Sequence, residues 1–245
     1  MAQPRLTTEL AQYVLPPVQF DGVCLEATDA AAVTAFWKVV LQGSLHDLGH
    51  GGFRVDPAPG RPAAEIVRVN TVPTVDPQVG RVHFDVRLPG PDPTHLVAAG
   101  GRLTKTIDHE PWYILADPEG NPLCAYPAVD ARPPGIFQLV VKSRDAEAQA
   151  RWWADILGGH VELEGEAAAV MGAPQFPWDF MVFDTVPEPK IAKNRMHWHV
   201  DLRDPGPAYL IDAGATVLRT PDATSRTWVL ADPEGNEFCA VPRSR

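Results

Sequence analysis

The sequence has few cysteines and no long hydrophobic run, and each absence excludes a class of protein. Its three cysteines are Cys24, Cys124 and Cys239, an odd number that does not predict a disulfide framework. No run of about eighteen apolar residues predicts a transmembrane helix, and the first residues lack the apolar core of a signal peptide. We therefore expect a cytoplasmic protein that does not bind to membranes.

Clustered positive charge is also missing. The formal net charge is −10 at pH 7, and the 21 Lys and Arg residues form no basic cluster, so the electrostatic footprint of a nucleic-acid-binding protein is absent. The sequence also lacks a phosphate-binding glycine loop, a dinucleotide-binding glycine pattern and the residue order of Ser-His-Asp hydrolases. These absences exclude nucleic acid as a partner and several common classes of enzyme.

One stretch of the chain occurs twice. Residues 115–127 are LADPEGNPLCAYP and residues 230–242 are LADPEGNEFCAVP, so ten of thirteen positions are identical. In each copy Asp-Pro-Glu-Gly has the composition of a type I turn, and the apolar residues on both sides predict a β-hairpin. The turn aspartates, Asp117 and Asp232, are 115 residues apart, and His83 and His197 keep nearly the same spacing. The chain is therefore a duplication of a domain-sized unit.

The duplication predicts how the chain is divided. The expected parts are an N-terminal arm with one short helix (1–17), a first domain (18–127), a linker (128–134) and a second domain (135–245). In each domain an aspartate, Asp29 or Asp145, is placed to cap a helix that follows a short strand. A second strand and a short helix come later in each domain. Each domain is thus expected to hold two units of strand, helix and several strands, which is an α+β fold.

Four such units, with DPEGN in the last hairpin of each domain, resemble the vicinal oxygen chelate superfamily, which includes glyoxalase I, bleomycin-resistance proteins and extradiol dioxygenases. Residues 186–197, VPEPKIAKNRMH, together with DPEGNEFC, are similar to its bacterial glyoxalase-like members. The first domain keeps only parts of this pattern, such as RVHFD at 81–85. The resemblance implies tandem domains whose four βαβββ units form two cup-shaped, mixed and mostly antiparallel sheets, with helices outside and one cup in each domain.

The resemblance also implies a divalent metal at the base of a cup. By position, the second domain offers Gln138, Asp179 and His197 as ligands, a set of oxygen and nitrogen donors suited to zinc, nickel, manganese or iron. Both domains have a thiol, Cys124 or Cys239, where the family has a carboxylate ligand. A buried cysteine on a strand is more often a small apolar residue than a ligand, so a cup without metal stays open as the alternative.

Strand alternation supports a polar cup lining independently of the resemblance. His197 and His199 share one side of their predicted strand, and His83 and Asp85 repeat the arrangement in the first domain. This polar side either lines a cup or faces water, and the pattern alone leaves both open. The residues expected to contact a ligand are Glu65, His83, Asp85, Tyr113, Cys124, His199, Trp228 and Cys239. The two aromatic residues in this set either stack on a flat ligand or pack in the core.

The expected function is that of a glyoxalase-like protein that binds a small organic metabolite in one or both cups. As an enzyme it would be a metal-dependent lyase, isomerase or dioxygenase, in which the metal polarises substrate oxygens and a carboxylate moves a proton. The alternative is a metal-free protein that sequesters a small molecule or an antibiotic without catalysis. A monomer and a homodimer are both compatible with a tandem chain.

Overall fold

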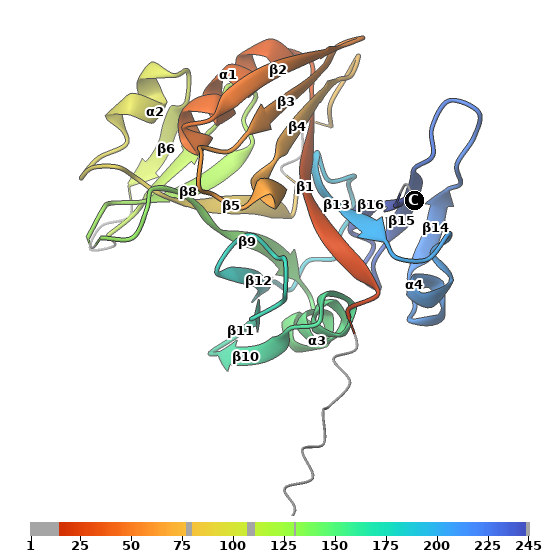
Figure 1. Ribbon diagram of the computed structural model, residues 1–245. Coiled ribbons are helices and arrows are strands. Elements are labelled where there is room, and N and C mark those ends of the chain that lie inside the picture. Colours follow the sequence, from red (N-terminus) through yellow and green to blue (C-terminus); the bar gives the residue numbers. More distant parts are fainter. Residues whose placement is uncertain (1–14, 77–79, 107–110, 130, 244–245) are drawn as a thin grey trace, which may run out of the picture.

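The computed structural model describes residues 15–76, 80–106, 111–129 and 131–243. The helix predicted within the N-terminal arm falls almost entirely outside these residues. Within them, four units follow one another along the chain, each with a strand, a helix and three further strands, as the sequence predicted (Figure 1). No described helix has the length together with the apolar character that a membrane span requires.

The four units share one order of elements. The first contains β1 (Val18–Ala27), α1 (Ala30–Leu41), β2 (Ser44–Gly49), β3 (Gly52–Asp56), the short 3-10 helix η1 (Ala63–Glu65) and β4 (Val67–Thr71). The second contains β5 (Val82–Arg87), α2 (Thr94–Ala98), β6 (Arg102–Thr106), β7 (Tyr113–Ala116) and β8 (Pro122–Tyr126). The third contains β9 (Gly135–Ser143), α3 (Ala146–Leu157), β10 (His160–Glu164), β11 (Ala167–Met171) and β12 (Phe180–Thr185). The fourth contains β13 (Met196–Leu202), α4 (Ala208–Asp212), β14 (Thr216–Arg219), β15 (Trp228–Ala231) and β16 (Glu237–Pro242).

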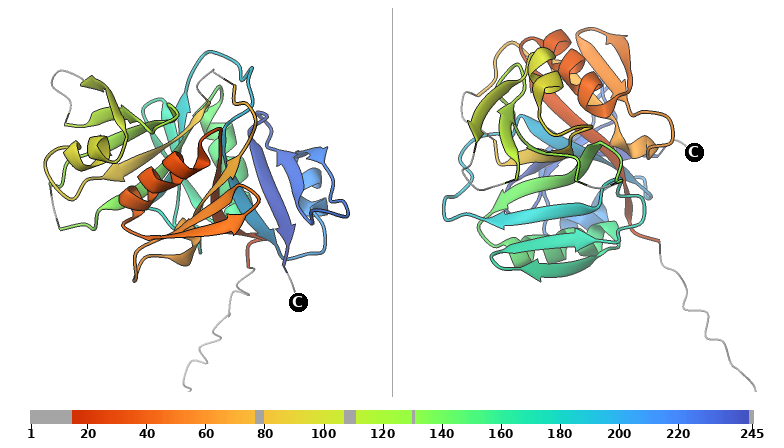
Figure 2. Two further views of the ribbon diagram at one scale, coloured as in Figure 1. Left: turned by 90° about the horizontal axis from the view of Figure 1, so that it is seen from above. Right: turned by 90° about the vertical axis from the view of Figure 1, so that its left-hand side faces the viewer.

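The described strands form two eight-stranded sheets, and each sheet combines units from both halves of the chain. The first sheet has the order β14-β15-β16-β13-β1-β4-β3-β2, so it joins the fourth unit to the first. The second has the order β10-β11-β12-β9-β5-β8-β7-β6 and joins the third unit to the second. We call the concave side of the first sheet cup A and that of the second sheet cup B; Figure 2 shows the sheets from two further directions.

The cups are therefore not confined to one domain each, and that part of the prediction was wrong. In cup A, β1 pairs antiparallel with β13, and Cys24 lies opposite His197. In cup B, β5 pairs antiparallel with β9, and Asp85 lies opposite Gln138. Alternation of polar and apolar residues determines which face of a strand lines a cup. This alternation looks the same whichever strand pairs with the one that carries it, so it cannot identify the partner strand.

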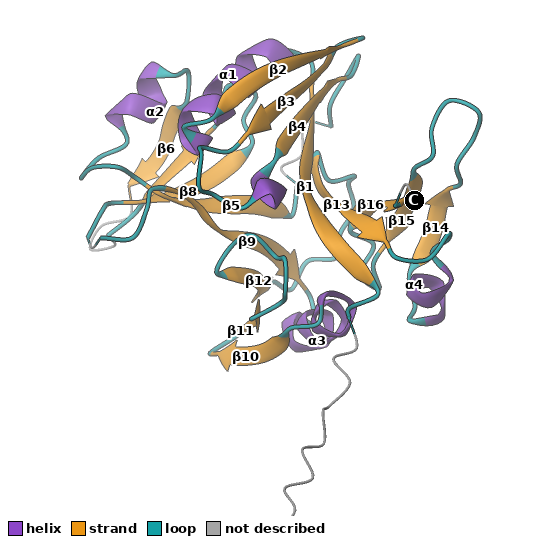
Figure 3. Cartoon of the chain, viewed as in Figure 1, coloured by secondary structure: helices purple, strands orange, loops and turns teal. Residues whose placement is uncertain are grey.

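The hydrophobic core is continuous through all four units, and two of its tryptophans connect the units within each half. Trp37 of α1 packs edge-to-face on Phe84 of β5, with ring centroids 5.3 Å apart. Trp153 of α3 packs in the same way on Trp198 of β13, with centroids 5.1 Å apart. The helices lie on the outside of the sheets, where their apolar faces cover this core (Figure 3). The core also joins the two halves, since Phe84 packs edge-to-face on Trp178 of the third unit with ring centroids 5.0 Å apart.

The repeated DPEGN turns attach each hairpin to the long helix of the neighbouring unit. Glu119 accepts a hydrogen bond from the backbone amide of Asp29, the residue that precedes α1. Glu234 accepts hydrogen bonds from the Ser143 hydroxyl and the Asp145 amide, both at 2.8 Å, just before α3. A carboxylate at a helix N-terminus satisfies free amides and complements the helix dipole. The glutamate of the motif is therefore a structural residue in both halves.

Candidate functional site

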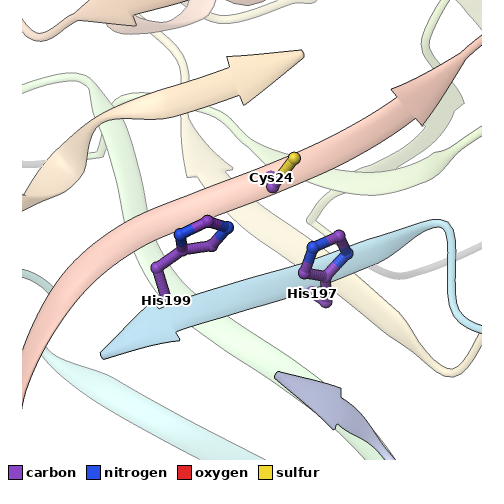
Figure 4. A group of neighbouring side chains, drawn as sticks. All are labelled: Cys24, His197 and His199. Carbon is purple, nitrogen blue, oxygen red and sulfur yellow. The ribbon is translucent and has the colours of Figure 1, made fainter. Parts of the chain in front are cut away.

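Cup A brings three potential metal ligands together at its base. Cys24 comes from β1, and His197 and His199 come from β13, the strand paired with it. Residues two positions apart on a strand point to the same side, so both imidazoles face the cup with the thiol. The Sγ atom of Cys24 and one ring nitrogen of each histidine lie within 4.8 Å of one another (Figure 4).

The two imidazoles are largely buried, and each has an unpaired nitrogen. His197 is 8% exposed, and its ring stacks on that of His199 with centroids 5.7 Å apart and planes inclined by 21°. Within the described residues, His197 Nδ1 and His199 Nε2 are buried without a hydrogen-bond partner. The Cys24 sulfur accepts a hydrogen bond from the Asn70 side-chain amide at 3.2 Å. A buried polar atom without a partner is costly, so these nitrogens are suited to meet a ligand.

Burial sets the protonation of these donors. It lowers the pKa of His197 to about 4, and it lowers the pKa of His199 well below its ordinary value. It raises the pKa of Cys24 to about 12 and that of Cys239, on β16, to about 11. At neutral pH both rings are therefore neutral and carry a free lone pair. The thiols stay protonated unless a cation compensates the thiolate.

A cavity of about 660 Å³ adjoins the two histidines. Its lining includes His197, His199 and Cys239, together with the apolar side chains of Leu218 and Val229. This volume lies within the range of sites that bind small organic molecules, about 300–1,000 Å³. The combination of polar base and partly apolar wall is also typical of such sites.

Two carboxylates border the same cavity, and each is held by a lysine. Glu26 forms an ion pair with Lys193, and Glu237 forms one with Lys190 at 2.7 Å. Both glutamates line the cavity. Both carboxylates of this cavity are therefore paired with neighbouring cations.

Cup B has a different, oxygen-rich base. Gln138 Nε2 donates a hydrogen bond to Asp85 Oδ2 at 2.7 Å, and His83 Nε2 lies 3.4 Å from Asp85 Oδ1. Cys124 adds a sulfur within 4.8 Å of donor atoms of His83 and Asp85. Burial raises the pKa of Asp184 on β12, and the charge of Asp85 adds to this shift while His83 opposes it. Asp85 Oδ2 thus accepts a hydrogen bond inside the cup, whereas Asp85 Oδ1 is buried without a hydrogen-bond partner among the described residues, like the ring nitrogens of cup A.

The metal ligands predicted from the sequence are divided between the two cups. His197 lies in cup A, whereas Gln138 lies in cup B, because β13 and β9 belong to different sheets. Asp179 precedes β12 and forms an ion pair with Arg87 at 2.6 Å. The three residues therefore do not form one site. The prediction combined them because it assumed that each cup is built within a single half.

Most of the residues predicted to contact a ligand do lie at the base of a cup. They are His83, Asp85 and Cys124 in cup B, and His199 and Cys239 in cup A.

The other three lie elsewhere. Glu65 is 1% exposed, and both of its carboxylate oxygens accept hydrogen bonds from Arg61, at 2.7 and 2.8 Å. Tyr113 and Trp228 pack against the hydrophobic core instead of facing a cup. The sequence left two roles open for these aromatic residues, stacking on a ligand or packing in the core, and the structure shows core packing.

Cys24 and Asn70 belong to the candidate site, although they were not predicted. A signal was present for the first, since Cys24 and Glu26 alternate with the apolar Val23 and Leu25 on the first strand. Asn70 had no such signal. Its position depends on the parallel pairing of β1 with β4, which places it beside Glu26.

Paired βαβββ units that curve around polar cups define a protein of the vicinal oxygen chelate class. The chain belongs to the glyoxalase-like domain family, whose model matches residues 22–126 and again residues 138–241. No curated protein matches the chain in sequence. The family assignment therefore depends on the two domain matches and on the fold.

Solved structures share this fold over nearly the whole chain. Glyoxalase I from Zea mays superimposes with a TM-score of 0.61 at 13% identity, covering 92% of this chain and 92% of that one. A putative dioxygenase from Bacillus subtilis subsp. subtilis str. 168 superimposes with a TM-score of 0.61 at 14% identity, covering 94% of this chain and 87% of that one. At these identities the similarity shows the fold alone.

Proposed function

We propose that cup A binds a small organic molecule at a divalent metal ion held by Cys24, His197 and His199. The observation that carries this proposal is the pair of buried ring nitrogens, His197 Nδ1 and His199 Nε2, which have no partner in the described part of the chain. Both histidines line the cavity of cup A. The Cys24 sulfur lies within 4.8 Å of a donor nitrogen on each ring, so one ion can contact all three residues.

The donor set fits zinc better than nickel, manganese or iron. Cysteine and histidine are the usual zinc ligands, and three protein ligands leave a fourth position for water or a bound molecule. A bound zinc ion would supply a Lewis acid that polarises an oxygen of that molecule. The chain contributes neutral imidazoles, and Asn70 holds the Cys24 sulfur by a hydrogen bond of 3.2 Å.

The proposed activity is a lyase, isomerase or oxygenase reaction on the bound molecule. Glu26 and Glu237 line the cavity, so each carboxylate is in a position to exchange a proton with a ligand. The fold shared with glyoxalase I from Zea mays and with a putative dioxygenase from Bacillus subtilis supports screening these reaction classes first.

The test is the metal content of protein purified without a chelator or an affinity tag, then incubated with zinc, nickel, manganese or iron and desalted. We expect about one zinc ion per chain, as a site with one set of ligands requires. Each of the substitutions Cys24→Ser, His197→Gln and His199→Gln should lower the zinc content. His83→Gln is the matched control, since it changes the equivalent histidine of cup B and should leave the zinc of cup A in place.

Unchanged zinc content in all three cup A variants would contradict the proposal, provided that circular dichroism shows them to be folded. A wild-type protein that binds none of the four metals would contradict it too. That second result would favour the alternative function, in which cup A sequesters a small molecule without a metal and without catalysis.

A further inference from the structure

The strand at the rim of cup A, β14, contains a β-bulge. Its pairing with β15 changes register between Val217 and Arg219. On a regular strand, neighbouring side chains point to opposite faces, but a bulge redirects one of them. As a result, Leu218 and Arg219 are adjacent in sequence and both line the cavity of cup A.

Arg219 brings an unpaired positive charge to this cavity. The other cation of the lining, Lys193, forms an ion pair with Glu26. In the described ranges, the Arg219 guanidinium takes part in no ion pair or hydrogen bond. Asp222, in the loop after β14, accepts hydrogen bonds from backbone amides of that loop through Oδ1. The hydrogen bonds from Thr224 and, to a smaller extent, the nearby charge of Arg219 lower the pKa of Asp222, but the two side chains form no ion pair in the described part of the chain. The charge of Arg219 reaches the base of the cup, because it opposes the burial that raises the pKa of Cys239 to about 11.

We propose that the ligand of cup A is a small organic acid whose carboxylate pairs with Arg219. The inference rests on the proposed ligand-binding function of cup A and adds the chemical class of the ligand. One guanidinium balances the single charge of a carboxylate and matches its two oxygens with two parallel N–H donors. Among the described side chains of the lining, Arg219 is the only cation outside an ion pair, because Lys193 is held by Glu26. The apolar body of the acid would lie against Leu218 and Val229.

The duplication supplies a matched control in cup B. Strand β6 has the same bulge, between Leu103 and Lys105, and Lys105 precedes Arg219 by 114 residues. Lys105 therefore occupies the equivalent rim position of the other cup. Replacing it changes the net charge of the protein as much as replacing Arg219 does, but leaves cup A intact.

The test compares an acid with its neutral amide. Binding of 3-phenylpropionate and 3-phenylpropionamide is measured by isothermal titration calorimetry, once with zinc-loaded protein and once with chelator-treated protein. We expect the acid to bind at least about 10-fold more tightly than the amide, as one charge-assisted pair implies. Arg219→Ala should abolish this ratio and Arg219→Lys should keep part of it, whereas Lys105→Ala should leave it unchanged. Added salt should weaken the binding of the acid and leave the binding of the amide unchanged.

Several results would overturn the inference. They are equal binding of acid and amide by the wild type, an unchanged ratio in Arg219→Ala, and no binding of the acid at millimolar concentration. Zinc content is measured in parallel, so that the two proposals fail separately. A wild-type protein that takes up no zinc on incubation but still prefers the acid through Arg219 contradicts the metal site alone. Protein that holds zinc and shows no preference contradicts the ligand class alone.

Discussion

The buried imidazole of His197 predicts that the metal-free protein loses stability in mild acid. Burial lowers the pKa of this ring to about 4, whereas an exposed histidine of the unfolded chain titrates near 6.5, roughly. Between these values the unfolded chain binds a proton that the folded chain does not, so the free energy of unfolding falls as the pH falls. The contribution is fully present above a pH of about 6.5 and is lost as the pH approaches 4.

The size of this loss follows from the gap between the two pKa values. A shift of one unit corresponds to about 1.4 kcal/mol, so linkage predicts a loss of about 2 kcal/mol by pH 5 and about 3 kcal/mol by pH 4. Such a loss is a large part of a typical folding free energy of about 5–15 kcal/mol. Burial also lowers the pKa of His199, which adds a loss of the same sign. It raises the pKa of the Asp184 carboxyl, which acts in the opposite direction.

The assay is urea unfolding of chelator-treated protein between pH 7 and pH 5, with the wild type compared against His197→Gln. We expect the variant to lose about 2 kcal/mol less than the wild type over this range. Asp184 is present in both proteins, so its contribution cancels in the comparison. Burial lowers the pKa of His199 and the neighbouring His197 lowers it further, so His197→Gln also reduces the loss that His199 causes, which increases the expected difference. Equal losses in the two proteins would refute the reasoning, because they would mean that the ring of His197 takes up a proton as easily in the folded state as in the unfolded one.

Further predictions concern the backbone, a helix cap and the metal. Gly22→Ala should destabilise by more than about 2 kcal/mol in urea unfolding, because the added Cβ would lie 2.5 Å from a backbone carbonyl oxygen at a φ of +86°. Gly60 has a φ of +88° and open space around it, so Gly60→Ala measures the backbone strain alone. If Gly60→Ala and Gly22→Ala lower the unfolding free energy equally, the steric contact at Gly22 is contradicted. Glu234→Ala removes the acceptor before α3 and should lower the unfolding free energy by about 1 kcal/mol, whereas Glu147→Ala, exposed on the same helix, should lower it by no more than about 0.5 kcal/mol. Chelation of zinc should lower the melting temperature of the wild type but not of Cys24→Ser, and equal melting shifts would contradict the cup A ligand set.

Much of the fold could be predicted because its signals are local and occur twice. Asp29 and Asp145 precede α1 and α3, and each accepts a hydrogen bond of 3.0 Å from an amide three residues later, as capping residues do. The DPEGN turns connect the last two strands of each half. Strand alternation grouped His83 with Asp85 and His197 with His199 on one side of their strands, and these residues do lie together. All of these features depend on residues that are close in sequence.

The base of each cup could not be predicted in the same way, because its residues come from strands that are far apart in the sequence. Gln138 and His197 lie in the same half of the chain but in different sheets. Cys24 lies beside His197 because β1 pairs with β13. Many strands of this chain have one apolar face, and backbone hydrogen bonding does not determine which of them pair. Tyr113 illustrates a second limit. A residue at the start of a strand points to one face or the other according to its register, and here it points to the core.

The exchange of units between the halves allows the two cups to differ. If the halves were separate and identical chains, each would give one unit to each cup, and twofold symmetry would make the cups equal. In a single polypeptide with two unequal halves, no symmetry requires the two cups to be equal. Gly22 and His199 stand in cup A where cup B has Gln138 and Asp85. The architecture is that of a homodimer, but the two pockets are as free to diverge as those of a heterodimer.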